Sequence, residues 1–261
     1  MATLDAGNQQ LSYEDFGGSG PVIVFIHAFG MNRSMFGPQL DVLKTRYRCI
    51  TWDQRAHGGS YTDRPFTMWD SARDCIELLD HLGIQQASLF GASQGAFVAL
   101  RLALLAPHRV RSLVTLGASA AAETPEKKSA YLQMQGALKD GEEPPQAFLD
   151  ALAYICFGSN FDGAYWQDVW RRWPAKQAKL ASNALIDRDD LSERLAEIAV
   201  PALVLHGSAD NAYTESENQA IADGLARSEP LVRIKGGTHF LSITDPEPVN
   251  AAVSSFLAKY T

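Results

Sequence analysis

Hydrophobic residues follow two patterns along the chain, short apolar runs and longer stretches with helical spacing. Six runs are short, rich in β-branched residues and typical of buried strands: 21–29, 47–53, 87–91, 110–117, 201–207 and 230–237. Between them, segments such as 67–83 and 94–107 repeat apolar residues every three or four positions, as amphipathic helices do. Strands that alternate with helices predict an α/β fold with a mostly parallel sheet covered on both faces.

Signals at the helix ends sharpen two of these predictions. Thr67 is expected to cap the helix over 67–83, with Asp70 as its capping-box partner and Gly83 at its end. The apolar side of this helix is predicted to consist of Ile76, Leu78, Leu79 and Leu82. The last helix is predicted to begin behind an N-cap at Asp245, with Pro246 in the first helical position.

The alternation stops between the fourth and fifth of these strands, where the chain is helical and rich in aromatic residues. The predicted organisation is therefore one α/β core in two parts, 1–118 and 188–261, with a helical insertion over 119–187. Trp166 and Trp170 are four residues apart and share one helix face. We expect at least two of Trp166, Trp170 and Trp173 to pack the insertion onto the core. The alternative is that one of them lines an apolar pocket.

The stretch "GASQG" places Ser93 directly after one predicted strand and directly before a helix. The flanking Gly91 and Gly95 leave room for a sharp turn, which would lift the serine hydroxyl above the sheet edge. The helix N-terminus at this point favours developing negative charge. Ser93 is therefore a candidate nucleophile, provided that a base lies nearby.

A candidate base and a candidate orienting acid also follow predicted strands. His239 lies in a Gly-rich loop just past the last strand, and Asp210 lies just after the preceding one. Because carboxyl ends of parallel strands meet at one edge of a sheet, we expect a triad of Ser93, Asp210 and His239. The alternative is that Asp210 caps a helix and His239 is a loop residue. The other histidines lie within a helix, in loops or at strand ends: His27, His57, His81, His108 and His206.

Two backbone N–H groups are candidates for an oxyanion hole. Gln94 follows the candidate nucleophile, and Phe29 lies at the end of the first of the six strands, where the next loop begins. Arg33 lies four residues after Phe29, near this loop, and could meet a substrate carboxylate. The alternative is a solvated loop arginine.

Composition excludes several other classes of function. The 261 residues are 46% hydrophobic and carry a formal net charge of −7 without a Lys/Arg run, which argues against nucleic-acid binding. No apolar run has membrane-spanning length, and "MATLDAGNQQ" lacks the features of a signal peptide. Cys49, Cys75 and Cys156 show no C-x-x-C spacing and are expected to be reduced, mostly buried thiols of a cytoplasmic protein. The sequence has no metal-binding motif, so neither a metal nor a cofactor is expected.

The chain resembles the α/β-hydrolase superfamily over essentially its full length. The matching segments are "HAFG" (27–30), "DQRAHGGS" (53–60), "GASQG" (91–95), "HGSAD" (206–210) and "GGTHF" (236–240). This resemblance implies an eight-stranded sheet with a helical lid and gives the roles of nucleophile, acid and base to Ser93, Asp210 and His239. Parts of the sequence are similar to 3-oxoadipate enol-lactonases, small carboxylesterases and perhydrolases. Ala28 departs from the Gly of many relatives, and Gln94 departs from a common Met.

The resulting hypothesis is a serine hydrolase that cleaves a small carboxylic ester or lactone with aromatic or aliphatic character through an acyl-enzyme. A carbon–carbon bond hydrolase or an acyltransferase could use the same triad. A hydrolase-like receptor for small molecules is the alternative from another class. The sequence does not specify the oligomeric state.

Overall fold

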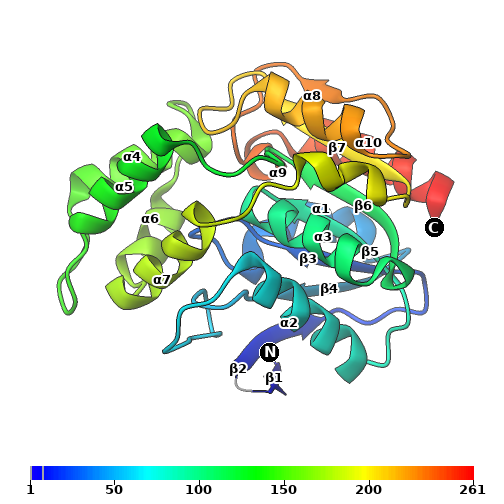
Figure 1. Ribbon diagram of the computed structural model, residues 1–261, viewed down its shortest axis with the longest axis horizontal. Coiled ribbons are helices and arrows are strands. Elements are labelled where there is room, and N and C mark those ends of the chain that lie inside the picture. Colours follow the sequence, from blue (N-terminus) through cyan, green and yellow to red (C-terminus); the bar gives the residue numbers. More distant parts are fainter. Residues whose placement is uncertain (1, 8) are drawn as a thin grey trace.

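The computed structural model of the protein describes residues 2–7 and 9–261, and the strands within these ranges form one eight-stranded sheet (Figure 1). Its strands are β1 (Ala2–Ala6), β2 (Gln9–Asp15), β3 (Val22–Ile26), β4 (Arg48–Trp52), β5 (Ala87–Ala92), β6 (Val110–Leu116), β7 (Ala202–Gly207) and β8 (Val232–Ile234). They are ordered β1-β2-β4-β3-β5-β6-β7-β8. β2 is antiparallel to β1 and β4, and the other neighbours are parallel. The predicted mostly parallel sheet is confirmed.

All six predicted strands are present, with differences at their ends. The strand expected over 230–237 is only three residues long, because the chain turns at "GG" directly after Lys235. The antiparallel pair β1 and β2 at the edge of the sheet was not predicted. Only Leu4 and Ala6 of β1 are buried, so its alternation is too short to stand out from a polar N-terminal stretch.

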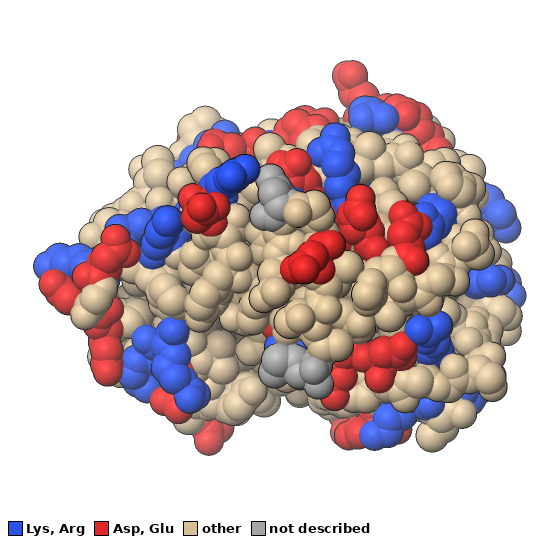
Figure 2. Space-filling view, turned by 90° about the horizontal axis from the view of Figure 1, so that it is seen from below, with Lys and Arg blue, Asp and Glu red and all other residues tan. Residues whose placement is uncertain are grey.

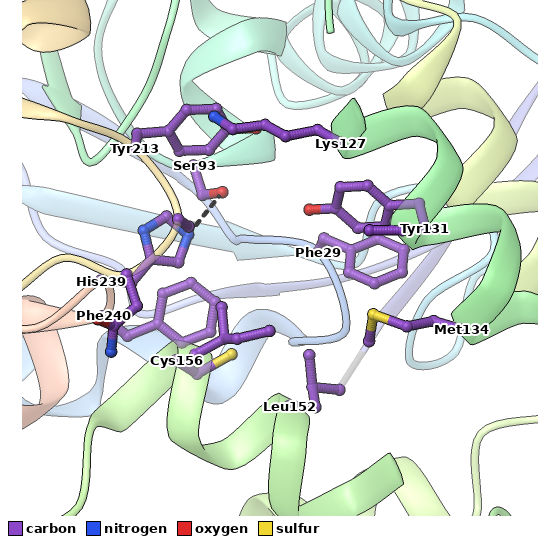
Figure 3. Close-up of a pocket in the computed structure, with 14 residues that line it drawn as sticks. Phe29, Ser93, Lys127, Tyr131, Met134, Leu152, Cys156, Tyr213, His239 and Phe240 are labelled. Carbon is purple, nitrogen blue, oxygen red and sulfur yellow. Dashed lines mark hydrogen bonds between the residues drawn. The ribbon is translucent and has the colours of Figure 1, made fainter. Parts of the chain in front are cut away.

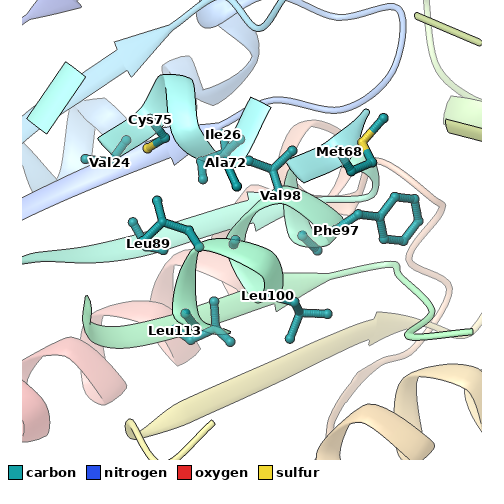
Figure 4. Packing of buried hydrophobic residues seen from close by; sticks show 14 of the residues in the cluster. Val24, Ile26, Met68, Ala72, Cys75, Leu89, Phe97, Val98, Leu100 and Leu113 are labelled. Atoms are coloured by element: carbon teal, nitrogen blue, oxygen red, sulfur yellow. The ribbon is translucent and has the colours of Figure 1, made fainter. Parts of the chain in front are cut away.

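The central strands bury both faces, which explains why they read as continuous apolar runs. Along β3, Val24 and Ile26 belong to one hydrophobic cluster, while Ile23 and Phe25 belong to the cluster on the opposite face. Helices α2, α3 and α8 contribute to the first cluster, and α1 and α10 contribute to the second. Figure 4 shows the first cluster, where side chains of the central strands meet those of α2 and α3.

The α-helices differ widely in length. They are α1 (Gly37–Leu43), α2 (Met68–His81), α3 (Gln94–Leu105), α4 (Pro125–Gly136), α5 (Gln146–Phe157), α6 (Ala164–Arg171), α7 (Ala175–Ile186), α8 (Glu215–Gly224), α9 (Leu241–Thr244) and α10 (Pro246–Tyr260). Short 3₁₀ turns occur at η1 (Arg33–Phe36), η2 (Pro107–Arg109) and η3 (Ser192–Glu197).

The predicted helix signals were partly right. The capping box of Thr67 and Asp70 is present at the start of α2. Leu78 and Leu79 are buried, but Ile76 and Leu82 are only partly buried, because Ser71, Ala72, Asp74 and Cys75 form the rest of the inward face. Asp245 does precede α10, yet its side chain does not cap the helix. Its Oδ2 instead accepts a hydrogen bond of 2.6 Å from the hydroxyl of Thr244.

Helices α4 to α7 come from the segment between β6 and η3 and lie to one side of the sheet (Figure 1). Trp166 and Trp170 are buried in the same hydrophobic cluster as the central strands. The Trp170 indole donates a hydrogen bond of 2.8 Å to the carbonyl of Gly30, and that of Trp173 donates one of 2.7 Å to Ala56. The expectation that at least two of these tryptophans pack the helices onto the core is confirmed.

The cysteines and the surface charges were also considered in the sequence-based predictions. Cys49, Cys75 and Cys156 are buried and free. Among residues 2–7 and 9–261, no helix is both long and apolar enough to cross a membrane. Figure 2 shows Lys and Arg side chains interspersed with Asp and Glu on one face, and the described residues visible there form no large patch of either sign.

Candidate active site

Ser93 occupies a strained turn between β5 and α3. Its backbone has φ 49° and ψ −115°, a conformation that a residue with a side chain rarely adopts. The turn requires glycine nearby, since a Cβ on Gly95 would lie 1.9 Å from the carbonyl oxygen of Ile26. The backbone N–H of Ser93 donates to Leu116 of the neighbouring strand at 2.8 Å, which holds the turn against the sheet. These contacts fix the serine hydroxyl at the carboxyl edge of the sheet.

The structure brings together the three residues that the sequence singled out. Nε2 of His239 lies 3.0 Å from Oγ of Ser93, and Nδ1 of His239 lies 3.0 Å from Oδ2 of Asp210. Because a carboxylate can only accept, the imidazole Nδ1 carries the proton and Nε2 accepts from the serine hydroxyl. All three side chains are buried, so these hydrogen bonds are formed in a medium of low dielectric constant.

The second oxygen of Asp210 is held by the turn that follows it. Oδ1 accepts hydrogen bonds from the backbone N–H groups of Ala212 at 2.7 Å and Tyr213 at 3.0 Å. Burial by itself raises the pKa of Asp210, but the charge and hydrogen bond of His239, with these two N–H groups, outweigh it and lower the pKa. Asp210 is therefore ionised and fixed in orientation.

Gly117, directly after β6, was not singled out from the sequence. Its φ is +57°, and a Cβ there would lie 3.1 Å from both Oδ2 of Asp210 and Nδ1 of His239. A larger residue would press on the hydrogen bond between these two side chains. The lone "LG" after a strand gives no sign of this role, because the contact is made with segments more than 90 residues away.

The N–H groups of Phe29 and Gln94 have no hydrogen-bond acceptor within the described residues, so both are free to bind a ligand. The residue after Phe29 is fixed at both of its polar atoms. The N–H of Gly30 donates to Nε2 of His57 at 3.2 Å, and its carbonyl accepts from Trp170. The loop that carries the Phe29 N–H is thus preorganised, which an oxyanion hole requires.

Two neutral, buried histidines form hydrogen bonds with this loop and with the segment that follows β4. Burial lowers the pKa of His57 to about 3, and it lowers that of His27 to about 4. His57 Nδ1 donates to the carbonyl of Arg55 at 2.8 Å, which leaves Nε2 as the acceptor for Gly30. His27 Nε2 likewise accepts from the N–H of Gln54 at 2.9 Å. The sequence-based expectation that a ring at a strand end satisfies backbone groups is confirmed for His27.

The side chain of Gln94 belongs to the same hydrogen-bond network as His27 and Gln54. Its Nε2 donates to Oε1 of Gln54 at 3.1 Å, and Nε2 of Gln54 donates to the carbonyl of His27 at 2.5 Å. The side chain of Gln94 therefore turns away from Ser93 and braces the loop, while its N–H remains available.

A cavity of about 220 Å³ opens beside Ser93 (Figure 3). Its walls are mostly apolar, with Phe29, Met134, Leu152 and Phe240 among them. Cys156 also lines it, but burial raises the pKa of this thiol well above its ordinary value, so it remains protonated and a poor nucleophile. Neither Trp166, Trp170 nor Trp173 belongs to these walls.

Arg33 does not reach this cavity. Its guanidinium pairs with the fully buried carboxylate of Asp53, whose Oδ1 also accepts from the Arg33 N–H at 2.7 Å. It is neither a solvated loop arginine nor part of the wall beside Ser93.

The cation that does line the cavity is Lys127 of α4, which sequence reasoning missed. Its Nζ lies 4.3 Å above the ring of Tyr213 and 3.3 Å from Oε1 of Glu217.

A buried ion pair supports the turn that holds Asp210. Arg188 and Glu123 pair with side chains that are 1% and 2% exposed, and the Tyr213 hydroxyl donates to Oε2 of Glu123 at 3.2 Å. Arg188 also lies 4.2 Å above the ring of Phe97. The turn after Asp210 is therefore anchored on charged groups beneath the cavity. In the described parts of the chain, no group of three His, Cys, Asp or Glu side chains could hold a metal ion.

Comparison with known proteins decides the family. The family described as alpha/beta hydrolase fold matches residues 21–246. The chain belongs to this family. The 3-oxoadipate enol-lactonase 2 of Acinetobacter baylyi is 26% identical to it over 269 residues, which cover 99% of this chain and 97% of the relative. The resemblance, the fold class and the expectation of a hydrolase enzyme drawn from the sequence are confirmed.

Solved structures of similar proteins agree with the fold. A hydrolase from Pseudomonas aeruginosa PA01 superposes with a TM-score of 0.89 at 26% identity, and the match covers 98% of this chain and 97% of the other. The enol-lactonase from Burkholderia xenovorans LB400 gives a TM-score of 0.90 at 24% identity, with 98% and 100% of the two chains covered. At that identity the second match is a likeness of fold alone.

Proposed function

We propose that this alpha/beta hydrolase is a serine hydrolase that cleaves a carboxylic ester or lactone through an acyl-enzyme on Ser93. The observation that carries the proposal is the pair of 3.0 Å hydrogen bonds that join Ser93 to His239 and His239 to Asp210 at the floor of an apolar cavity. The relative from Acinetobacter baylyi, named as an enol-lactonase, adds support for ester or lactone chemistry.

In the proposed reaction, Nε2 of His239 takes the proton of Ser93 as Oγ attacks the substrate carbonyl carbon. The N–H groups of Phe29 and Gln94 stabilise the oxyanion, and each such donor typically contributes about 3 kcal/mol. The C–O bond breaks and His239 gives the proton to the leaving oxygen. In a lactone, that oxygen stays attached to the acyl chain.

Water completes the cycle. His239 removes a proton from a water molecule that attacks the acyl-enzyme, and then returns this proton to Ser93 as the acid is released. Asp210 orients His239 throughout and stabilises its charged form. The scheme uses only side chains, backbone N–H groups and water. The helical segment 119–187 acts as a lid over the cavity, between the core parts 1–118 and 188–261.

The test is steady-state hydrolysis of a panel of 4-nitrophenyl esters and simple lactones. Ser93→Ala is expected to abolish turnover, and Asp210→Asn is expected to lower kcat by roughly 10⁴-fold, as seen when a triad acid is neutralised. Ser71→Ala is a matched control, because Ser71 is a buried serine of α2 whose hydroxyl has no partner within the described residues.

Full turnover in Ser93→Ala would contradict the proposal. A single turnover by the unmodified protein, with binding of a partner protein that depends on the ligand, would favour a receptor instead. Hydrolysis of a diketone to a carboxylic acid and a ketone, without hydrolysis of esters, would favour carbon–carbon bond cleavage.

A further inference from the structure

The hydroxyl of Tyr131 enters the cavity from α4 and has no hydrogen-bond partner within the described residues (Figure 3). Other polar groups of the cavity wall are already engaged. Ser93 and His239 bond each other, Lys127 lies beside Glu217, and Nδ2 of Asn211 donates to the carbonyl of Tyr154 at 3.3 Å. The Tyr131 hydroxyl is thus a free polar group in mostly apolar surroundings.

The position of this hydroxyl is set before a substrate arrives. The ring of Tyr131 packs edge-to-face on Phe29, with the ring centroids 6.1 Å apart. Helix α4 is fastened to α7 by Gln135, whose Nε2 donates to Oγ of Ser182 at 2.7 Å and to Oδ1 of Asn183 at 2.9 Å. A group held in this way loses little conformational entropy when it binds a ligand.

The chemistry of the group is that of a neutral donor. Burial raises the pKa of Tyr131 above its ordinary value, and the negative charge of Glu123 raises it further. The phenol therefore keeps its proton, and it donates a hydrogen bond rather than removing a proton. A substrate that fills the cavity displaces water from this hydroxyl, and an unpaired buried donor carries a penalty of about 1–3 kcal/mol.

Figure 3 shows which part of a substrate would meet the hydroxyl. Tyr131 points across the cavity toward Ser93 from the side opposite His239. The leaving oxygen must face His239, which gives it a proton, so a group beside Tyr131 belongs to the acyl part of the substrate. We propose that Tyr131 donates a hydrogen bond to an oxygen atom in the acyl chain, close to the scissile carbonyl. The enzyme then prefers acyl groups with an ether or carbonyl oxygen there over plain alkyl groups.

This inference rests on the proposed ester hydrolysis and is tested with two substrates of matched shape. 4-Nitrophenyl methoxyacetate and 4-nitrophenyl butyrate differ by one oxygen in place of a methylene group. kcat/KM is measured for both with the wild type and with Tyr131→Phe, which removes the hydroxyl and keeps the ring against Phe29. Comparing the two enzymes cancels the difference in intrinsic reactivity of the esters.

We expect the preference of the wild type for the methoxyacetate to fall about tenfold in Tyr131→Phe, the size of one lost hydrogen bond to the substrate. The butyrate is expected to react equally fast or faster. Tyr154→Phe is the matched control, because Tyr154 lies on α5 with 57% of its surface exposed, and it should leave the preference unchanged.

The outcomes separate the two proposals. An unchanged preference in Tyr131→Phe overturns this inference. An equal fall with both esters also overturns it, because it would place the hydroxyl on the oxyanion or make it purely structural. If the wild type shows no Ser93-dependent turnover of either ester, the proposed function itself is contradicted, and this inference is contradicted with it.

Discussion

The indole N–H of Trp170 donates a hydrogen bond of 2.8 Å to the carbonyl of Gly30, although the two residues are 140 positions apart. This bond joins helix α6 to the loop that carries the Phe29 N–H. Trp170 is 1% exposed, so the bond is formed in a medium that excludes water. The helical segment and the proposed oxyanion hole are therefore parts of one rigid unit.

Trp170→Phe tests this link. The change leaves a buried carbonyl without a partner, so we expect a loss of about 1–3 kcal/mol in the free energy of unfolding, together with a fall in kcat. Trp166→Phe is the control, because Trp166 is also buried in α6 but its indole N–H has no acceptor within the described residues. Urea unfolding and ester hydrolysis are measured for both. Equal effects of the two changes on kcat would contradict the link.

The buried pair of Glu123 and Arg188 leads to a second prediction. Glu123→Gln leaves the Arg188 charge buried without its counter-ion, and the expected loss of stability is about 3 kcal/mol or more. Glu197→Gln removes one partner of the exposed pair with Arg194 and should leave stability almost unchanged, because solvent screens this pair. Urea unfolding separates the two variants. A Glu123→Gln protein as stable as the wild type would mean that the pair does not support the turn after Asp210.

The turn at Ser93 predicts a strong effect of one methyl group. In Gly95→Ala, the new Cβ would collide with the carbonyl oxygen of Ile26, so the turn must shift, and we expect loss of both stability and hydrolysis. In Gly136→Ala nothing lies within 4 Å of the new methyl group at the end of α4. This control should be neutral or stabilised by up to about 1 kcal/mol. Normal activity in Gly95→Ala would rule out the close approach.

The two neutral, buried histidines beside the loop that carries the Phe29 N–H predict how stability depends on pH. His57 and His27 have pKa values of about 3 and about 4 in the folded protein, against about 6.5 in an unfolded chain. Between these values the unfolded state binds more protons than the folded state. The stability that the two neutral rings contribute is therefore fully present above about pH 6.5 and is lost as the pH falls. The free energy of unfolding should drop by on the order of 4 kcal/mol from about pH 7 to about pH 4.5.

Urea unfolding across this range measures the slope. His57→Gln keeps a donor and an acceptor in place of the ring and should reduce the slope by about half. His108→Gln changes an exposed histidine and should leave the slope as it is. A slope that His57→Gln does not alter would show that other groups govern the acid sensitivity.

The sequence predicted the arrangement of Ser93, Asp210 and His239 because each follows a strand of a parallel sheet. Topology alone then brings the three together, whatever the details of packing. Ser93 had a second signal, since a glycine on each side is needed where the backbone turns so sharply. Such features are local, and a single sequence records them directly.

Contacts between distant segments could not be predicted in the same way. Arg33 lies next to the candidate oxyanion loop in the sequence, and only the fold shows that Asp53 captures its guanidinium. Tyr131 and Lys127 face the cavity because of how α4 docks on α7, and the helix has no buried residue that would mark one face as inward. Strands β1 and β2 were missed because β1 buries only Leu4 and Ala6, and two of the four buried positions of β2 are the polar residues Gln9 and Ser12.

Gly30 is held at its N–H by His57 and at its carbonyl by Trp170, and this has a consequence for inhibition. A compound that wedged α6 away from the core would displace the Phe29 N–H without entering the space beside Ser93. Such a compound would slow the chemical step at every substrate concentration and leave substrate binding intact. Inhibition at the contact between α6 and this loop would therefore be noncompetitive with substrate.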